Sequence, residues 1–204
     1  MPFLLRVELP DVPGSLGRVA AAIGEAGGDI EAIEVVEHRA DDGTAVDDVL
    51  LETAPGVMPD SIVSACNLLD GVHVLWISRY AAGGNLFLDL EAVEELSEHP
   101  VQALDRLIEL IPAVFRSDWA ARVRRTEDGV TVLHSTSAAP DELGWFDIDR
   151  STMVESDDEN TVLAAAPLLN DIVVVGRRGG PEYLESELAR MGHLIGLAIT
   201  ISRS

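Results

Sequence analysis

The sequence contains no lysine, and all 14 of its basic residues are arginine. Without a lysine amine, the chain cannot form a Schiff base with pyridoxal phosphate or with a carbonyl substrate. It also cannot build a Walker A loop, because that loop needs a lysine to reach the nucleotide phosphates. These two kinds of enzyme chemistry are therefore excluded.

Positive charge of any kind is scarce. The 14 arginines stand against 36 acidic residues, which gives a formal net charge of −22. A phosphate backbone is bound by clustered Arg and Lys side chains, so this charge opposes nucleic-acid binding. It disfavours an anionic membrane surface for the same reason. We therefore expect neither nucleic acid nor membrane among the partners of this acidic protein.

Cysteine and long hydrophobic runs are also lacking. Cys66 is the only cysteine, so an intrachain disulfide and a Cys-based zinc site are excluded. The residues that follow Met1 lack the basic start and apolar core of a signal peptide. No uncharged apolar run approaches the ~20 residues of a membrane span. A reducing compartment, the cytoplasm, is the predicted location.

Aromatic residues make up only 4% of the chain, but hydrophobic residues make up 47%. Such a composition is too apolar for a disordered chain and predicts a folded globular protein. We expect three parts: a first domain over residues 1–80, a linker and helix start over 81–94, and a second domain over 95–204. The most linker-like stretch is the small-residue run at 81–85.

The first domain is predicted to alternate strands and helices in the order βαββαβ. Apolar residues alternate along 3–9, which is typical of a half-buried strand, and recur every three or four residues from Leu16 to Ile23, which is typical of a helix. Further strands are expected at 30–37, 45–53 and 72–80, with a short helix at 62–69. A four-stranded antiparallel sheet with both helices on one face, the ferredoxin-like fold, satisfies this order.

The second domain is predicted to be α+β, with an antiparallel sheet flanked by helices. Helical periodicity covers residues 93–111; Pro100 divides it or kinks it, and Pro112 is expected to end it. Strands are expected at 119–125, 130–134, 161–167 and 172–176. The acidic stretch 137–160 is expected to be a long excursion, and Gly179-Gly180-Pro181 to open the last helix.

The segment from Leu9 to Gly17 joins the first strand to the first helix. Pro13 and Gly14 allow a tight turn that exposes backbone N–H groups, and the helix N-terminus adds partial positive charge. A small carboxylate or phosphate could bind there. The alternative is an ordinary strand–helix turn, with Ser15 or Asp11 as the helix cap.

This segment, Asp-x-Pro-Gly-x-Leu-Gly, is followed after a helix by Gly-Gly-Asp-Ile at residues 27–30. In a βαββαβ setting that covers residues 3–80, the pattern resembles an ACT domain. The resemblance implies an amino-acid-binding regulatory domain that pairs with a second copy. It places the ligand between the strand–helix loop of one copy and the start of the second strand of the other. The implied ligand-binding residues are Asp11, Val12, Pro13, Gly14, Ser15, Leu16, Asp29 and Ile30.

One residue departs from the family pattern. Asp29 stands where ligand-binding members often have Asn, and an ionised Asp can only accept hydrogen bonds. Together with Asp11 it would attract an ammonium group and repel a ligand carboxylate. An amino acid or related amine between two copies of a homodimer is the predicted ligand. A cationic ligand, or none, is the alternative.

Residues 95–204 carry a second resemblance. The stretch Val173–Tyr183, the helix after it and the hairpin at 119–134 are similar to parts of GAF-like domains. GAF domains bind small molecules or dimerise, and here the likeness implies the fold more than the ligand. The pairing of the two domains resembles actinobacterial ACT domain-containing proteins of undefined role.

We expect the other candidate residues to have structural roles rather than binding or catalytic ones. The group His38, Asp41, Asp42, Asp47 and Asp48 lacks metal-binding spacing and is expected to be a solvated acidic hairpin. Two exposed arginines are expected in the turn at 176–180. Trp76 and Trp119 are expected in the core, and Trp145-Phe146 either anchors its loop or closes a pocket. Cys66 is expected to be buried and inert.

The sequence shows no nucleophile–base pair, metal cluster or cofactor loop. We therefore expect no catalytic residue, no cofactor and no metal site. The prediction is a non-catalytic regulatory protein that binds a small ligand. The alternative is a ligand-free dimerisation or protein-interaction scaffold, and an enzyme is the third possibility.

Overall fold

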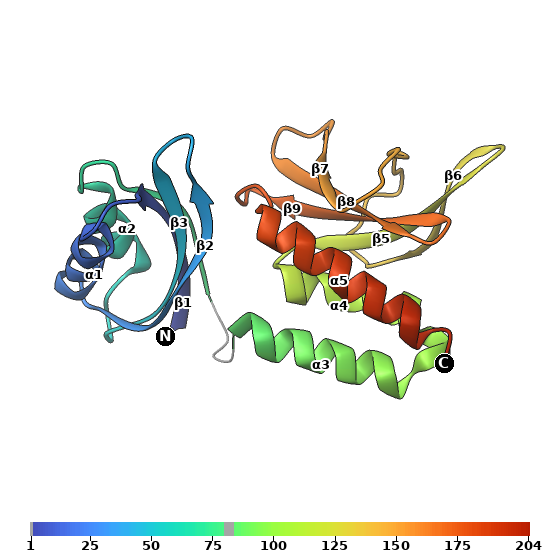
Figure 1. Cartoon of the computed structure of the whole chain (residues 1–204), viewed down its shortest axis with the longest axis horizontal. Coiled ribbons are helices and arrows are strands. Elements are labelled where there is room, and N and C mark those ends of the chain that lie inside the picture. The colour runs from blue at the N-terminus through green and yellow to red at the C-terminus, as the bar shows by residue number, and fades with distance from the viewer. Residues whose placement is uncertain (1, 80–83) are drawn as a thin grey trace. The chain divides into compact units, whose positions relative to one another are not determined.

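The computed structural model describes residues 2–79 and 84–204. It divides into two compact units, Met1–Ala82 and Gly83–Ser204 (Figure 1). Of the predicted linker, residues 81–83 lie outside the described residues. Gly84 and Asn85 already belong to a helix, so the linker prediction was wrong for these two residues.

The first unit has the predicted βαββαβ order. Its strands are β1 (Pro2–Pro10), β2 (Gly28–Arg39), β3 (Thr44–Thr53) and β4 (His73–Arg79), and its helices are α1 (Ser15–Glu25) and α2 (Pro59–Asn67). The strands pair antiparallel in the order β2-β3-β1-β4. The predicted ferredoxin-like arrangement is confirmed.

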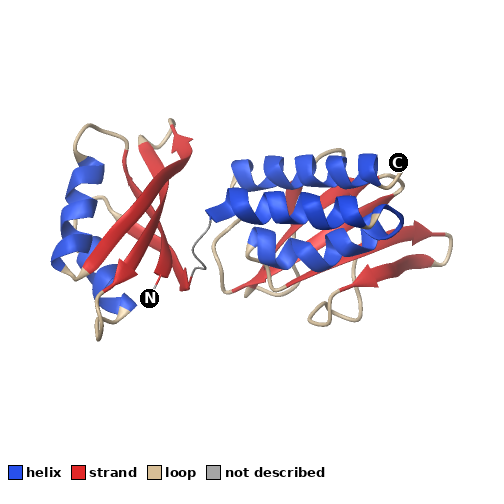
Figure 2. Ribbon diagram, turned by 90° about the horizontal axis from the view of Figure 1, so that it is seen from below, coloured by secondary structure: helices blue, strands red, loops and turns tan. Residues whose placement is uncertain are grey.

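Both helices of this unit lie on one side of its sheet (Figure 2). The alternating apolar residues of β1, from Phe3 to Leu9, face that side and pack with Val19 and Ile23 of α1 and Ile62 and Cys66 of α2. Trp76 does not join this core, because it pairs with Arg6 on the opposite side of the sheet. The prediction of a core position was therefore wrong for Trp76.

The second unit contains a five-stranded antiparallel sheet in the order β6-β5-β9-β8-β7. Its elements are α3 (Gly84–Glu98), a 3-10 turn (Pro100–Gln102), α4 (Ala103–Phe115), β5 (Trp119–Thr126), β6 (Gly129–Ser135), β7 (Thr152–Val154), β8 (Thr161–Leu168), β9 (Asp171–Arg178) and α5 (Glu185–Ile201). The predicted α+β class is confirmed. The short strand β7 within the acidic excursion was not predicted.

The helices of the second unit gather on one face of its sheet (Figure 2). Leu107, Ile111 and Met191 pack there against alternate residues of β8 and β9. The other face carries a smaller core around Trp119, covered by excursion residues such as Leu143 and Phe146. The sheet is thus buried on both faces, by helices on one side and by the acidic excursion on the other.

Two expected helix boundaries are corrected by the structure. Pro112 lies inside α4, which continues to Phe115 before Arg116 adopts a left-handed conformation with φ of 50°. Val114 and Phe115 are buried in the helix-side core, so packing offsets the backbone hydrogen bond that the proline lacks. The last helix begins at Glu185, four residues after the predicted Gly-Gly-Pro start.

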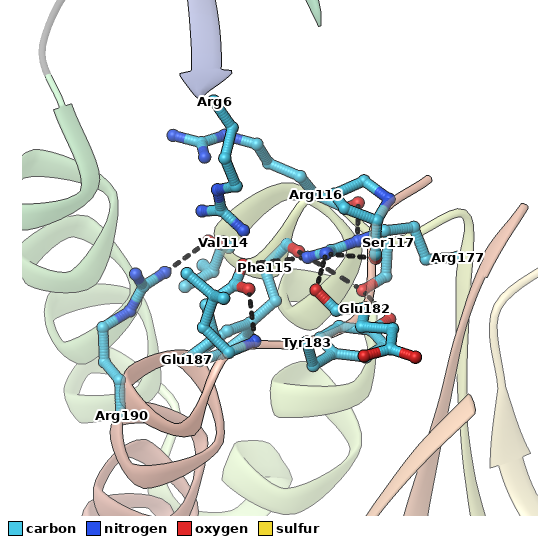
Figure 3. Close-up of polar contacts among 12 residues, drawn as sticks. Arg6, Val114, Phe115, Arg116, Ser117, Arg177, Glu182, Tyr183, Glu187 and Arg190 are labelled. Atoms are coloured by element: carbon cyan, nitrogen blue, oxygen red, sulfur yellow. Dashed lines mark hydrogen bonds and ion pairs between the residues drawn. The ribbon is translucent and has the colours of Figure 1, made fainter. Parts of the chain in front are cut away.

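The expectation of two exposed arginines at 176–180 was wrong for Arg177. Residues 176–178 close strand β9, and Arg177 is only 2% exposed. Its guanidinium donates to the carbonyl oxygens of Phe115 and Arg116 and pairs with Glu187 at 2.9 Å (Figure 3). It also lies 4.1 Å from the ring centroid of Tyr183.

None of the described helices is both long and apolar enough to span a membrane.

Candidate functional site

The connection between β1 and α1 forms the predicted tight turn. Gly14 has φ of 93° and occupies the N-cap position, and its side-chain-free geometry allows this left-handed conformation. No side chain caps the helix, so the alternative of Ser15 or Asp11 as cap was wrong. The first turn of a helix leaves N–H groups without intrahelical partners, and here the preceding residues 11–14 are exposed. The N–H groups of Asp11, Val12 and Ser15 already donate to carbonyls of the unit and Pro13 has none, so of the exposed residues 11–14 Gly14 is the one that can present its N–H to a ligand.

Asp11 and His38 meet at the edge of this loop. The Asp11 Oδ2 atom lies 3.0 Å from His38 Nδ1, and the two side chains are 51% and 65% exposed. The backbone N–H of Asp11 donates to the carbonyl of Gly43, which holds the loop against the β2–β3 hairpin. Residues far apart in the sequence therefore form one rim.

Asp47 lies close enough to this rim for the charges of Asp11 and His38 to act on its carboxyl. It pairs in register with Val7 of β1 and so shares the helix-facing side of the sheet. Asp47 is 2% exposed, and its Oδ1 atom has no hydrogen-bond partner among the described residues. Burial raises the pKa of the Asp47 carboxyl; His38 opposes this shift, and Asp11 and Asp48 reinforce it.

The carboxylate of the neighbouring Asp48, unlike the Oδ1 atom of Asp47, is paired with an arginine. Arg6 donates to both of its carboxylate oxygens, at 2.7 and 2.9 Å. The predicted solvated acidic hairpin is confirmed for Asp41 and Asp42, which are exposed, and was wrong for Asp47 and Asp48. The strand register buries these last two residues, and the composition of the hairpin gave no signal of it.

Ser15 adds a second unpartnered group at this end of the unit. It is the first residue of α1 and is 3% exposed, and its Oγ has no partner among the described residues. A buried hydroxyl or carboxylate without a hydrogen bond is costly, so each such group needs an explanation. A bound ligand would supply the missing partners for Asp47 and Ser15.

The other predicted site residues lie at the far end of the same sheet. Pro10, which leads into the loop, pairs with Thr44, whereas Asp29 pairs with Glu52. Eight residues of β3 separate these two pairs, a distance of about 26 Å at the usual rise per residue. Asp29 is exposed and Ile30 packs partly against the core. One copy of the unit therefore does not bring Asp29 and Asp11 together.

The second unit contains a pocket of about 390 Å³ beside the acidic excursion. Phe146 lines it, whereas the Trp145 indole donates to Asp147 at 2.9 Å and packs against the small core. The pair thus divides the two predicted roles: Trp145 anchors the loop and Phe146 borders a pocket. The polar lining comes from Glu142, Glu155, Ser156, Asp157, Asp158, Thr161 and Arg178.

One carboxylate–histidine group occurs in the described part of the second unit. Glu95, Glu98 and His99 can each place a ligand atom within 4.8 Å of the others. Glu95 is already paired with Arg106, so its charge is partly neutralised. This group gives no support for a metal site, and the absence of a metal stays a prediction.

Comparison with protein families bears out the first resemblance. Residues 3–57 match the ACT domain family, a range that includes all eight predicted ligand-binding residues. No curated protein matches the chain.

The solved structures that resemble the chain include two GAF domains. One, from Pseudomonas syringae pv. tomato, is 14% identical with a TM-score of 0.44, and the match covers 56% of this chain and 83% of that one. The other, from an Acinetobacter phosphoenolpyruvate-protein phosphotransferase, is 10% identical with a TM-score of 0.45 and covers 60% and 95%. A formyltetrahydrofolate deformylase from Pseudomonas putida is 9% identical with a TM-score of 0.34 and covers 99% and 93%.

Proposed function

Because residues 3–57 match the ACT domain family, we propose that this chain is a non-catalytic regulatory protein. Its first unit binds a small ligand, an amino acid or a related amine, between two copies of the chain. The observation that carries this proposal is the β1–α1 loop. It combines an exposed turn, a left-handed Gly14 and a buried Ser15 hydroxyl that has no partner in the described part of the chain.

The separation within one unit supports the need for two copies. Asp11 and Asp29 lie at opposite ends of the sheet, about 26 Å apart along β3. A small ligand can contact an Asp11 and an Asp29 only if these two residues come from different copies of the chain. A homodimer that places the loop of one copy against the β2 start of the other satisfies this requirement.

Ligand binding at such an interface changes the pairing equilibrium. A ligand shifts a population only by the difference in its affinity for the two states. Here a bound ligand stabilises the arrangement that completes the site, and the second unit receives the change in pairing. In this proposal neither unit performs chemistry.

The test is a thermal-shift screen of the full chain against the common amino acids and their amines, with sedimentation to measure pairing. A ligand at 100 times its dissociation constant adds about 2.7 kcal/mol to the free energy of unfolding, which raises the Tm by several degrees. Gly14→Val should abolish that shift, because the left-handed turn then carries a β-branched side chain.

Gly56→Val is the matched control. Gly56 also has a left-handed φ, of 87°, and open space around it, but it lies outside the loop. It therefore carries the same backbone strain without touching the site. A ligand that binds a chain shown to be monomeric at the same concentration would overturn the interfacial site.

A specific observation favours the second candidate, a ligand-free scaffold. Asp11 and Asp47 place two carboxylates at the loop, where they repel the carboxylate of an amino acid. If no ligand shifts the Tm and Gly14→Val leaves pairing intact, the scaffold is the better account.

A further inference from the structure

The Asp47 carboxylate is buried, and one of its two oxygens has no hydrogen-bond partner among the described residues. Its Oδ1 atom makes no hydrogen bond among the described residues, although Asp47 is 98% removed from solvent. The Ser15 Oγ, at the same end of the unit, is likewise buried and unpartnered. An ionised Asp47 can only accept, so the group that completes its Oδ1 must donate, and the Ser15 hydroxyl can accept from the same donor.

Arg18, on the first turn of α1, is exposed, and neither it nor any other described arginine is among the charges that act on Asp47. Arg6 is held by Asp48, and Arg39 donates to Glu8 at 2.5 Å and to Glu37 at 3.3 Å. Among the described residues, the basic group that acts on Asp47 is His38, which already contacts Asp11. Among the described residues, Asp47 therefore has no guanidinium to neutralise its charge.

This charge selects among ligands of the proposed site. A ligand carboxylate would face Asp11 and Asp47, and in the two-copy arrangement Asp29 of the other copy as well. These negatively charged residues would repel the carboxylate of the ligand. An ammonium group instead offers three N–H donors and a positive charge, which match an ionised carboxylate and a hydroxyl.

We propose that Asp47, with Ser15, binds the ammonium group of an amine ligand that carries no carboxylate. This inference rests on the proposed function, whose ligand it restricts from amino acids and amines to amines alone. Asp11 and His38 form the rim of the site, and Asp47 is the buried anionic residue that determines the preference.

The experiment compares each amino acid with the amine formed by its decarboxylation. The pairs are arginine and agmatine, ornithine and putrescine, histidine and histamine, and phenylalanine and phenethylamine. Binding to the full chain is measured by calorimetry and by thermal shift. We expect at least one amine to bind at least about tenfold more tightly than its parent amino acid, the difference that one charged hydrogen bond supplies.

Asp47→Asn should weaken binding of that amine at least about tenfold, because it removes the charge and keeps the shape. Asp41→Asn is the matched control, since it removes an exposed charge from the same hairpin. It should change the affinity by less than about threefold, as expected for a screened surface charge. The Tm of the ligand-free Asp47→Asn variant shows separately that it folds.

The outcomes separate this inference from the proposed function. If an amino acid binds as tightly as its amine, the restriction to amines is overturned and the regulatory ligand site stands. If an amine binds the Asp47→Asn variant as it binds the original chain, Asp47 is not the binding residue. If sodium or potassium ions alone give the same shift, the site binds inorganic cations and the amine proposal fails. If no compound binds, the proposed ligand site itself falls.

Discussion

The ring of Trp119 lies against Gly176, its register partner in the neighbouring strand. A Cβ atom on Gly176 would come within 2.2 Å of the indole of Trp119. We therefore expect Gly176→Ala to destabilise the second unit by about 1–3 kcal/mol, because an overpacked core forces side chains and backbone to shift. Thermal unfolding should show a Tm lower by several degrees.

Gly196→Ala serves as the control for this prediction. Gly196 lies in α5 with nothing within 4 Å of its added Cβ, so alanine should stabilise the helix by about 0.5–1 kcal/mol. Equal Tm values for the Gly176→Ala variant and the original chain would contradict the close approach to Trp119.

Arg177 should be the most sensitive charged residue of the second unit. The Arg177 and Glu187 side chains are 3% and 9% exposed, and Arg177 also donates to carbonyls at the end of α4. Arg177→Met removes the guanidinium that pairs with the buried Glu187 carboxylate and donates to the carbonyls of Phe115 and Arg116, a loss of about 3–5 kcal/mol. Chemical denaturation would measure it as a lower midpoint.

The adjacent Arg178 provides the comparison. It is exposed, and its guanidinium makes one long contact of 3.4 Å to the carbonyl of Ala138. Arg178→Met should therefore change stability by about 0.5 kcal/mol or less. Similar losses in the two variants would show that the guanidinium of Arg177 is not specifically required.

Asp47 should give the ligand-free protein a distinctive pH dependence. Burial raises the pKa of its carboxyl above the 3.8 of an exposed Asp, with His38, Asp11 and Asp48 as the neighbouring charges. Between 3.8 and the raised value the folded state holds a proton that the unfolded chain has released. The free energy of unfolding therefore falls as pH rises through this window.

Asp47→Asn removes the titrating carboxyl, and with it the decrease in the free energy of unfolding at higher pH. We expect the variant to have a higher Tm than the original chain at neutral pH. The difference in Tm between the two proteins should become smaller as the pH falls toward 4, near the usual pKa of Asp. Asp41→Asn should show no such change of the difference with pH. A variant less stable at neutral pH would mean that the ionised Asp47 stabilises the fold.

Cys66 should react only when the first unit opens. It is fully buried on α2, and burial raises the pKa of its thiol, which lowers the thiolate population. A thiol reagent followed by mass spectrometry should label the native chain slowly and the denatured chain at once. Rapid native labelling would show that α2 separates readily from its sheet.

The sequence predicted most of the fold because its apolar periodicities are long and consistent. The alternation of Phe3 to Leu9 and the turn at Asp41-Asp42-Gly43 fix neighbouring strands of the first unit. The predicted helix end at Pro112 was wrong because local propensity cannot show that Val114 and Phe115 are buried by distant elements. The prediction for Arg177 was wrong for the same reason, since its acceptors Phe115 and Arg116 are 62 and 61 residues away in the sequence.

Of the candidate site, the sequence predicted only the residues that are neighbours along the chain. Residues 11–16 are continuous in the sequence and form the β1–α1 loop and the first two residues of α1, so the motif alone located them. Asp47 was missed because its burial follows from pairing with Val7 and from the nearness of Asp11 and His38. An apolar run that is interrupted by one acid on the core-facing side of a strand is the signal that could have identified it.

The Arg177 hydrogen bonds also determine when the second unit can be completed during synthesis. Sixty-two residues separate Phe115 from the arginine that its carbonyl accepts from. At ribosomal rates of 5–20 residues per second, the end of α4 emerges roughly 3–12 s before that partner exists. Until then the apolar face of α4, with Leu107, Ile108 and Ile111, also lacks the later strands and helix that bury it, and such exposed apolar surface is prone to aggregation.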